Sequence, residues 1–192
     1  MTARLILICQ ASADAAQRAA FPADEPLDDT GLRRTLAVAK YLPRADRCWA
    51  SPELRATQTA EALELAAIPL PALRDCDYGS WTGQRFEEVL TKYPQEVSRW
   101  LRDPDAAPHG GESLAGMMQR VADWLDGQNA LDSDSIVVTH ASIVRAAIVH
   151  AIEASPKSFW RIDIAPLSIT RLSGKDGRWN LTSAGAVLTG VT

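Results

Sequence analysis

The sequence predicts an α/β domain built around a largely parallel sheet. Short apolar runs alternate along the chain with segments whose apolar residues recur at helical spacing. Two of the runs, residues 5–9 and 135–139, are almost continuously apolar, as expected for strands that are covered on both faces. Each is followed by polar residues and then by a helical segment, which is the order of a parallel βα unit.

The first helix is predicted over residues 29–42, after a loop that contains two prolines. Its apolar side chains recur at helical spacing, which predicts a stripe that packs on the core. The stripe consists of Leu32, Leu36, Ala39 and Leu42. Residues 46–50 then give a short strand candidate.

The segment Ser51-Pro52-Glu53 is typical of a helix start. Serine is favoured at the N-cap, proline at the first helical position and an acidic residue in the first turn. This second helix is predicted to run to about residue 65. Residues 66–110 give the least regular pattern, and a helix is expected within residues 86–101.

The C-terminal half predicts two helices, a buried strand and a hairpin. The first helix is indicated by apolar residues at helical spacing, namely Leu114, Met117, Met118, Val121, Trp124 and Leu125. The strand at 135–139 leads into a helix at 143–152 that is apolar on almost every side, so we expect it inside the fold. Residues 166–172 and 179–182, separated by a Ser-Gly-Lys-Asp-Gly segment, predict a terminal hairpin.

Length and composition narrow the classes of function. A chain of 192 residues with 46% hydrophobic and 23% charged residues is expected to form one domain, residues 1–192. The formal charge of −4 argues against a basic face for nucleic acid. No apolar run approaches the roughly 18 residues of a membrane span, and the first run is too short for a secretory leader. We therefore expect a cytoplasmic protein, a monomer or homodimer, that binds neither nucleic acid nor membrane.

The cysteines and histidines predict neither a metal site nor an organic cofactor. Cys9, Cys48 and Cys76 are far apart in sequence and form no C-x-x-C pair, and their odd number does not suggest a disulfide framework. The three histidines lack H-x-x-x-H spacing.

Polar residues follow three of the predicted strands: Cys9-Gln10, residues 51–55, and His140. In open α/β sheets, ligands bind outside the carboxyl ends of the strands and beside helix N-termini. His140 also precedes an apolar helix whose N-terminal amides favour an anion. Taken alone, His140 fits a helix-capping or core histidine with satisfied hydrogen bonds better than a ligand-binding one. The three features together make this sheet edge the candidate ligand site.

Five segments, in order, resemble the motifs of the histidine phosphatase superfamily, which includes cofactor-dependent phosphoglycerate mutases and alpha-ribazole phosphatases. Residues 51–60 resemble S-x-x-x-R-A-x-Q-T-A, and residues 73–83 resemble L-x-E-x-x-x-G-x-W-x-G. Residues 109–113 are similar to G-G-E-S, and residues 137–140 to V-V-S/T-H. The opening strand occupies the place of the family's R-H-G loop. The resemblance covers residues 4 to about 150 and implies a three-layer α/β/α, phosphoglycerate mutase-like fold.

The resemblance also implies a chemistry. A phosphomonoester is close to a dianion at neutral pH, so its site needs cations around the phosphoryl group. In the family, two arginines clamp the phosphate, the R-H-G histidine attacks phosphorus, a second histidine stabilises the oxyanions and a carboxylic acid protonates the leaving oxygen. Carried over by motif, Arg55 is the helix arginine, His140 the second histidine and Asp75 the acid.

The first loop departs from this pattern, because Cys9-Gln10-Ala11 stands in place of Arg-His-Gly. Gln10 occupies the nucleophile position, and a carboxamide cannot be phosphorylated and released at a useful rate. Cys9 replaces a cationic clamp, which removes a charged hydrogen bond worth roughly 1.5–3 kcal/mol. Asp75 is one methylene shorter than the usual glutamate. The chain is therefore expected to bind a small phosphorylated molecule or inorganic phosphate and to be catalytically weak or inactive.

Two other hypotheses stay open. In the first, the chain is a working phosphatase in which Cys9 or an activated water attacks with His140 as its partner. In the second, it is a non-catalytic module that binds a protein partner.

Three further residues have weaker claims on the site. Ser12 could contact phosphate or be a solvated turn serine. Glu112 lies at a helix start, where an acid is favoured anyway. Arg145 lies one turn into the helix after His140 and fits a surface ion pair equally well. Three tryptophans, Trp81, Trp100 and Trp160, are expected either at the pocket mouth or in packing.

Overall fold

The computed structural model describes residues 3–13, 18–128 and 133–188. Six strands form one sheet in the order β3-β2-β4-β1-β5-β6. Their bounds are β1 Ala3–Cys9, β2 Arg47–Ala50, β3 Ile68–Pro69, β4 Asp134–Thr139, β5 Ser168–Lys175 and β6 Arg178–Val187. The first four strands are parallel, whereas β5 and β6 pair antiparallel with their neighbours. The sheet is therefore largely parallel, as the sequence predicts.

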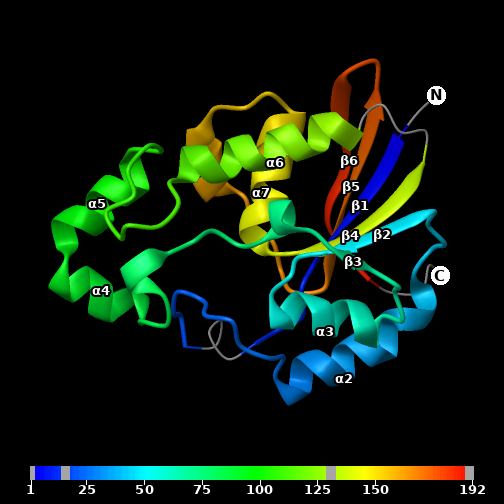
Figure 1. Cartoon of the computed structure of the whole chain (residues 1–192), viewed down its shortest axis with the longest axis horizontal. Coiled ribbons are helices and arrows are strands. Elements are labelled where there is room, and N and C mark those ends of the chain that lie inside the picture. The colour runs from blue at the N-terminus through cyan, green and yellow to red at the C-terminus, as the bar shows by residue number, and fades with distance from the viewer. Residues whose placement is uncertain (1–2, 14–17, 129–132, 189–192) are drawn as a thin grey trace.

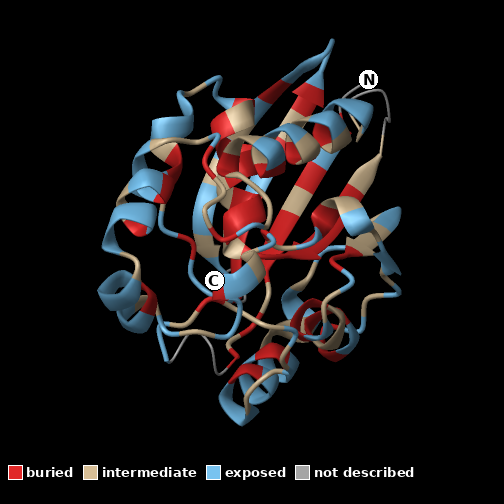
Figure 2. Cartoon of the chain, turned by 60° about the vertical axis from the view of Figure 1, so that its left-hand side comes forward, coloured by how far each residue is buried: buried red, intermediate tan, exposed pale blue. Residues whose placement is uncertain are grey.

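Helices cover both faces of the sheet, which gives three layers (Figure 1). Helices α6 (Leu114–Gln128) and α7 (Ala141–Ala151) pack on one face, and α2 (Asp29–Val38) and α3 (Leu54–Ala62) lie on the other. The side chains of β1 alternate between the two cores, because Leu5 and Leu7 join the α6–α7 cluster and Ile8 joins the α3 cluster. The central strands and α7 are accordingly buried along most of their length (Figure 2).

A third apolar cluster lies under α4 (Phe86–Lys92) and α5 (Pro94–Arg102), to one side of the sheet. The single helix expected within residues 86–101 is two helices. Tyr93, at the junction, has a φ of −134°, because the residue before a proline is disfavoured in the helical region. Within the described ranges there are also four short 3-10 helices, namely η1 Ala39–Tyr41, η2 Pro71–Leu73, η3 Gly79–Trp81 and η4 Pro156–Arg161.

The stripe predicted for α2 points largely to solvent, which corrects the sequence-based expectation. Leu32 and Leu36 are 43% and 58% exposed, whereas Gly31 and Thr35 are buried. The helix approaches the first loop so closely that a Cβ on Gly31 would lie 2.4 Å from the carbonyl oxygen of Ser12. Only small side chains fit on this face, so the leucines lie outside, and only the C-terminal end of the stripe packs on the core.

The start of α3 also differs from the prediction. The helix begins at Leu54 and ends at Ala62, with Glu53 rather than Ser51 at the N-cap. Its first amide is capped from a distant loop, because Asp24 Oδ1 accepts a hydrogen bond from Leu54 N at 2.7 Å. A cap that comes from a distant loop leaves no pattern in the local sequence. Because Ser51 is not the N-cap, its side chain takes part in the site described below.

The terminal hairpin has longer strands and a shorter loop than predicted. Lys175 pairs with Arg178, so the turn contains only Asp176 and Gly177. Both have positive φ, +52° and +77°, the conformation that two-residue hairpin turns require. Among the described residues, no helix has both the length and the apolar character needed to cross a bilayer.

Candidate functional site

The three polar segments predicted at strand ends meet at one edge of the sheet. Cys9 at the end of β1 is in register with Thr139 at the end of β4. The backbone N–H of Gln10 donates a hydrogen bond to the carbonyl oxygen of Thr139 at 2.7 Å. On the other side of β4, the Ser51 amide donates to Val138 O at 2.8 Å. These ladder contacts place the first loop, the segment before α3 and His140 side by side.

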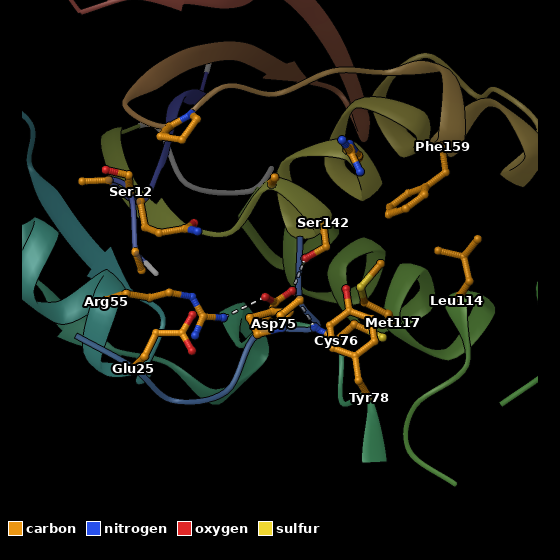
Figure 3. Close-up of a pocket in the computed structure, with 18 of the residues that line it drawn as sticks. Ser12, Glu25, Arg55, Asp75, Cys76, Tyr78, Leu114, Met117, Ser142 and Phe159 are labelled. Carbon is orange, nitrogen blue, oxygen red and sulfur yellow. Dashed lines mark hydrogen bonds and ion pairs between the residues drawn. The ribbon is translucent and has the colours of Figure 1, made fainter. Parts of the chain in front are cut away.

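A pocket opens at this edge, with one polar wall and one apolar wall (Figure 3). Ser12, Glu25 and Arg55 lie on one side, and Leu114 and Phe159 lie on the other, with Asp75 and Ser142 between them. The lining also includes residues from loops distant in sequence, namely Gln10, Tyr78, Trp100, Met117, Arg145 and Trp160. An anion and an apolar group can thus be held by opposite ends of one pocket.

Arg55 is a buried cation in this wall, 3% exposed. Its Nη1 donates to Ala23 O at 2.6 Å, and its Nη2 donates to Asp75 Oδ2 at 2.8 Å. Thr59 fixes α3 against the first loop, because its hydroxyl donates to Arg55 O and accepts from Ala11 N. A guanidinium has five N–H groups, so Arg55 keeps donors for an anion in the pocket.

Asp75 connects the groups around the pocket. One oxygen pairs with Arg55, and the other accepts hydrogen bonds from the Cys76 amide at 2.9 Å and from the hydroxyl of Ser142. The Asp75 amide in turn donates to Glu53 Oε1 at 3.0 Å. The carboxylate is thus held between α3 and the first turn of α7.

His140 lies behind Asp75, 1% exposed. Its Nε2 is 2.7 Å from Ser51 Oγ and 3.2 Å from Glu53 Oε2. Its Nδ1 is 3.7 Å from Asp75 Oδ2 and has no hydrogen-bond partner within the described part of the chain. The structure therefore brings Arg55, Asp75 and His140 together, although His140 is not among the described residues that line the pocket.

Glu53 holds the imidazole in place. Burial by itself would raise the pKa of Glu53, but the hydrogen bond and charge of His140, together with the Ser51 hydroxyl, outweigh it and lower the pKa to about 2. Sequence reasoning noted Glu53 only as a helix-start residue. The feature of the sequence that could have identified Glu53 as a site residue is its position two residues after Ser51, the first residue of the 51–60 motif.

Replacing Glu53 with glutamine tests this arrangement. Because the folded state depresses the pKa from about 4.5 to about 2, the carboxylate stabilises the fold above pH 4.5, and this contribution is lost as pH falls towards 2. We expect Glu53→Gln to lower the free energy of unfolding at pH 7 by up to about 3 kcal/mol. In denaturant titrations, the difference in unfolding free energy between parent and variant should shrink as the pH falls from 4.5 towards 2. A difference that does not change with pH would contradict this role.

Gln10 and Cys9 occupy the first loop as a neutral pair. Gln10 lines the pocket, whereas Cys9 is buried, and the Cys9 thiol donates to Gln10 Oε1 at 3.5 Å. Burial, with a smaller contribution from the charge of Asp75, raises the pKa of Cys9 to about 12. A protonated, buried thiol is a poor nucleophile, which counts against the hypothesis that Cys9 attacks the substrate.

The three residues with weaker claims lie in different places. Ser12 lines the pocket, but its hydroxyl donates to Asp28 Oδ1 at 3.0 Å, so in this arrangement its one proton is not available to a phosphate. Glu112 forms an ion pair with Arg120 at 2.6 Å and lies outside the described lining, so a role in the site stays a prediction. Arg145 lines the pocket.

Two of the three tryptophans reach the pocket. Trp100 and Trp160 line it, whereas Trp81 is buried in the third apolar cluster. Sequence reasoning missed Ser142 and Tyr78. Ser142 gave one signal, its position two residues after His140, and Tyr78 lies inside the 73–83 motif.

The chain is similar to proteins of known family. The family described as the histidine phosphatase superfamily (branch 1) matches residues 6–186. The phosphoserine phosphatase 1 of Hydrogenobacter thermophilus is 31% identical over 146 residues, which cover 71% of this chain and 69% of that protein. A bifunctional protein of Mycobacterium tuberculosis is 32% identical over 156 residues, 74% of this chain but only 42% of that protein.

A solved structure supports the fold. The phosphoserine phosphatase of Entamoeba histolytica, determined as a mutant with phosphoserine, superposes with a TM-score of 0.84. The sequences are 22% identical, and the superposition covers 95% of this chain and 96% of that one. At this identity the likeness shows that the two chains share the three-layer fold.

Proposed function

The chain belongs to the histidine phosphatase superfamily, and on that premise we propose that it binds a small phosphomonoester and hydrolyses it slowly or not at all. The observation that carries the proposal is that Arg55, Asp75 and Gln10 line one pocket, with His140 directly behind Asp75. Relatives named as phosphoserine phosphatases support a small phosphorylated ligand.

Arg55 is the main anion clamp in this proposal. An entering phosphate competes with Asp75 for the guanidinium, because the two are paired at 2.8 Å in the free protein. In this proposal Asp75, displaced from Arg55, is the group that gives a proton to the leaving oxygen.

Two other residues complete the anion site. The Oε1 atom of Gln10 accepts from the Cys9 thiol, which leaves the amide Nε2 to donate to a phosphate oxygen. Arg145 supplies a second positive charge in place of the arginine that Cys9 replaces. Its Nε is buried without a hydrogen-bond partner among the described residues, and its Nη2 lies 3.9 Å from an Asp163 side chain that is fully exposed.

His140 has an indirect role in this arrangement. Its Nδ1 faces the carboxylate of Asp75, and the imidazole is oriented by Ser51 and Glu53. When Asp75 is protonated or displaced by phosphate, Nδ1 becomes the nearest ring nitrogen to the anion. The imidazole then stabilises developing negative charge.

Thermal unfolding with inorganic phosphate or orthovanadate tests the proposal. A ligand at a hundred times its Kd adds about 2.7 kcal/mol of stability, so we expect the Tm to rise by several degrees. Sodium chloride at equal ionic strength is the control. An unchanged Tm would favour the alternative of a partner-binding module without a ligand. Ordinary turnover numbers on generic phosphomonoesters would contradict the catalytic half of the proposal.

A further inference from the structure

We propose that the pocket selects phosphomonoesters whose leaving group is apolar and planar, and that Trp160 is the main residue of this selection. The inference rests on the proposed function, because it describes the half of the pocket that faces away from Arg55. Nothing in the family motifs assigns this half.

The wall opposite Arg55 is aromatic. Trp100 of α5 and Trp160 of η4 have ring centroids 4.9 Å apart at an interplanar angle of 72°. Phe159 and Trp160 lie 5.0 Å apart at 85°. These edge-to-face contacts fix the orientation of the rings before a ligand arrives, so little conformational freedom is lost on binding.

Aliphatic side chains from α6 complete this end. Leu114 and Met117 line the pocket and are 4% and 1% exposed, so they are already held by the core. Tyr78 adds a phenol, and burial raises its pKa well above the ordinary value, so the ring stays neutral. A polar leaving group would lose water here without gaining matching hydrogen bonds.

Arg145 lines the pocket and contacts this wall. Its guanidinium carbon lies 5.7 Å from the centroid of the Phe159 ring, a stacking distance for a cation over an aromatic face. The guanidinium is itself planar and stacks on aromatic rings as readily as it binds acids. A rival ligand with a second acidic group would use the same guanidinium, so the experiment must compare the two.

Trp160 is the part of the wall that a ligand can still cover. It is 37% exposed, whereas Trp100 and Phe159 are 8% and 3% exposed. Covering apolar surface stabilises a complex by about 25 cal/mol per Å², and each tenfold in affinity needs 1.4 kcal/mol. A phenyl ring against this wall is therefore expected to improve affinity by about tenfold or more.

Binding measurements on the chain with Gln10 in place test the inference, because slow turnover keeps the ligands intact. The probes are phenyl phosphate, 3-phosphoglycerate and inorganic phosphate, each titrated by calorimetry. We expect phenyl phosphate to bind about tenfold more tightly than 3-phosphoglycerate. Trp160→Ala should raise the Kd of phenyl phosphate by about five- to tenfold and change the Kd of inorganic phosphate by less than twofold. Trp160→Phe should keep most of the preference.

Ile152→Ala is the matched control, because Ile152 is 50% exposed and lies outside the described lining of the pocket. It should leave all three affinities unchanged. If 3-phosphoglycerate binds as tightly as phenyl phosphate, or Trp160→Ala leaves their ratio unchanged, the inference is wrong while the proposed function stands. If none of the three probes binds, both are wrong.

Discussion

Replacing Gln10 with histidine is expected to raise phosphomonoester hydrolysis by at least about a thousandfold. Loss of a covalent nucleophile costs on the order of 10⁶ in rate, and only part of this should return because Cys9 still replaces a clamp. Residue 10 lines the pocket beside Arg55 and Asp75, so an imidazole there faces the same anion site. The measurements are phosphate release from phenyl phosphate and mass-spectrometric detection of an acid-labile phosphohistidine.

Gln10→Asn is the control for this experiment, because it changes the size of the side chain without supplying a nucleophile. It should leave turnover at the parent level. If Gln10→His binds inorganic phosphate normally yet shows neither faster turnover nor a phosphohistidine, then Cys9 or Asp75 has disabled the site as well. That outcome would contradict the prediction.

Removing the guanidinium of Arg55 is expected to have the second large effect. Arg55→Ala leaves the buried carboxylate of Asp75 without its ion-pair partner, and such uncompensated charges cost about 3–5 kcal/mol of stability. The same change should raise the Kd of inorganic phosphate by about a hundredfold or more, since truncating a buried charged donor costs about 2–5 kcal/mol of binding free energy. Denaturant unfolding and calorimetric titration measure the two effects.

Arg120→Ala is the control that distinguishes a loss of stability from a loss of phosphate binding. Arg120 is also a largely buried arginine, and its guanidinium pairs with Glu112 at 2.6 Å outside the described pocket lining. Arg120 also donates to the backbone carbonyls of Arg74 and Asp75, so the variant should lose stability and should weaken phosphate binding far less than Arg55→Ala does. Arg55→Lys, which keeps the charge, covers the case in which Arg55→Ala fails to fold. Parent-level phosphate affinity in both Arg55 variants would show that Arg55 is not the clamp.

Local patterns predicted the sheet and most of the helices correctly. The run at residues 5–9 is the core of β1, and the spacing from Leu114 to Leu125 marks the buried face of α6. These predictions succeed because burial on two faces or on one helical stripe leaves its period in the sequence. The motif at residues 51–60 likewise placed Arg55 on a helix beside the sheet edge.

The predictions that failed depended on distant contacts. Leucines 32 and 36 were expected inside, but the close approach of Gly31 to the first loop turned them outward. The cap of α3 comes from Asp24, so the start of this helix also differs from the prediction. None of these partners is a sequence neighbour, so no periodic pattern marks them.

Sequence alone determined the family, the largely parallel α/β fold and most of the strands and helices, because residue type and spacing identify them, although β3 lies in a segment without a regular pattern. That Gln10 replaces the family's nucleophile stays a prediction. Tertiary structure decided which groups share the pocket. The register of β1, β2 and β4 brings Gln10, Ser51 and His140 to one edge, and only there do Glu53, Asp75 and Ser142 form a single hydrogen-bonded network. Tertiary structure also brings Trp100 of α5 against Trp160 of η4, so that both rings line the same pocket as Arg55. The two elements are distant in sequence, so only their packing creates this aromatic wall.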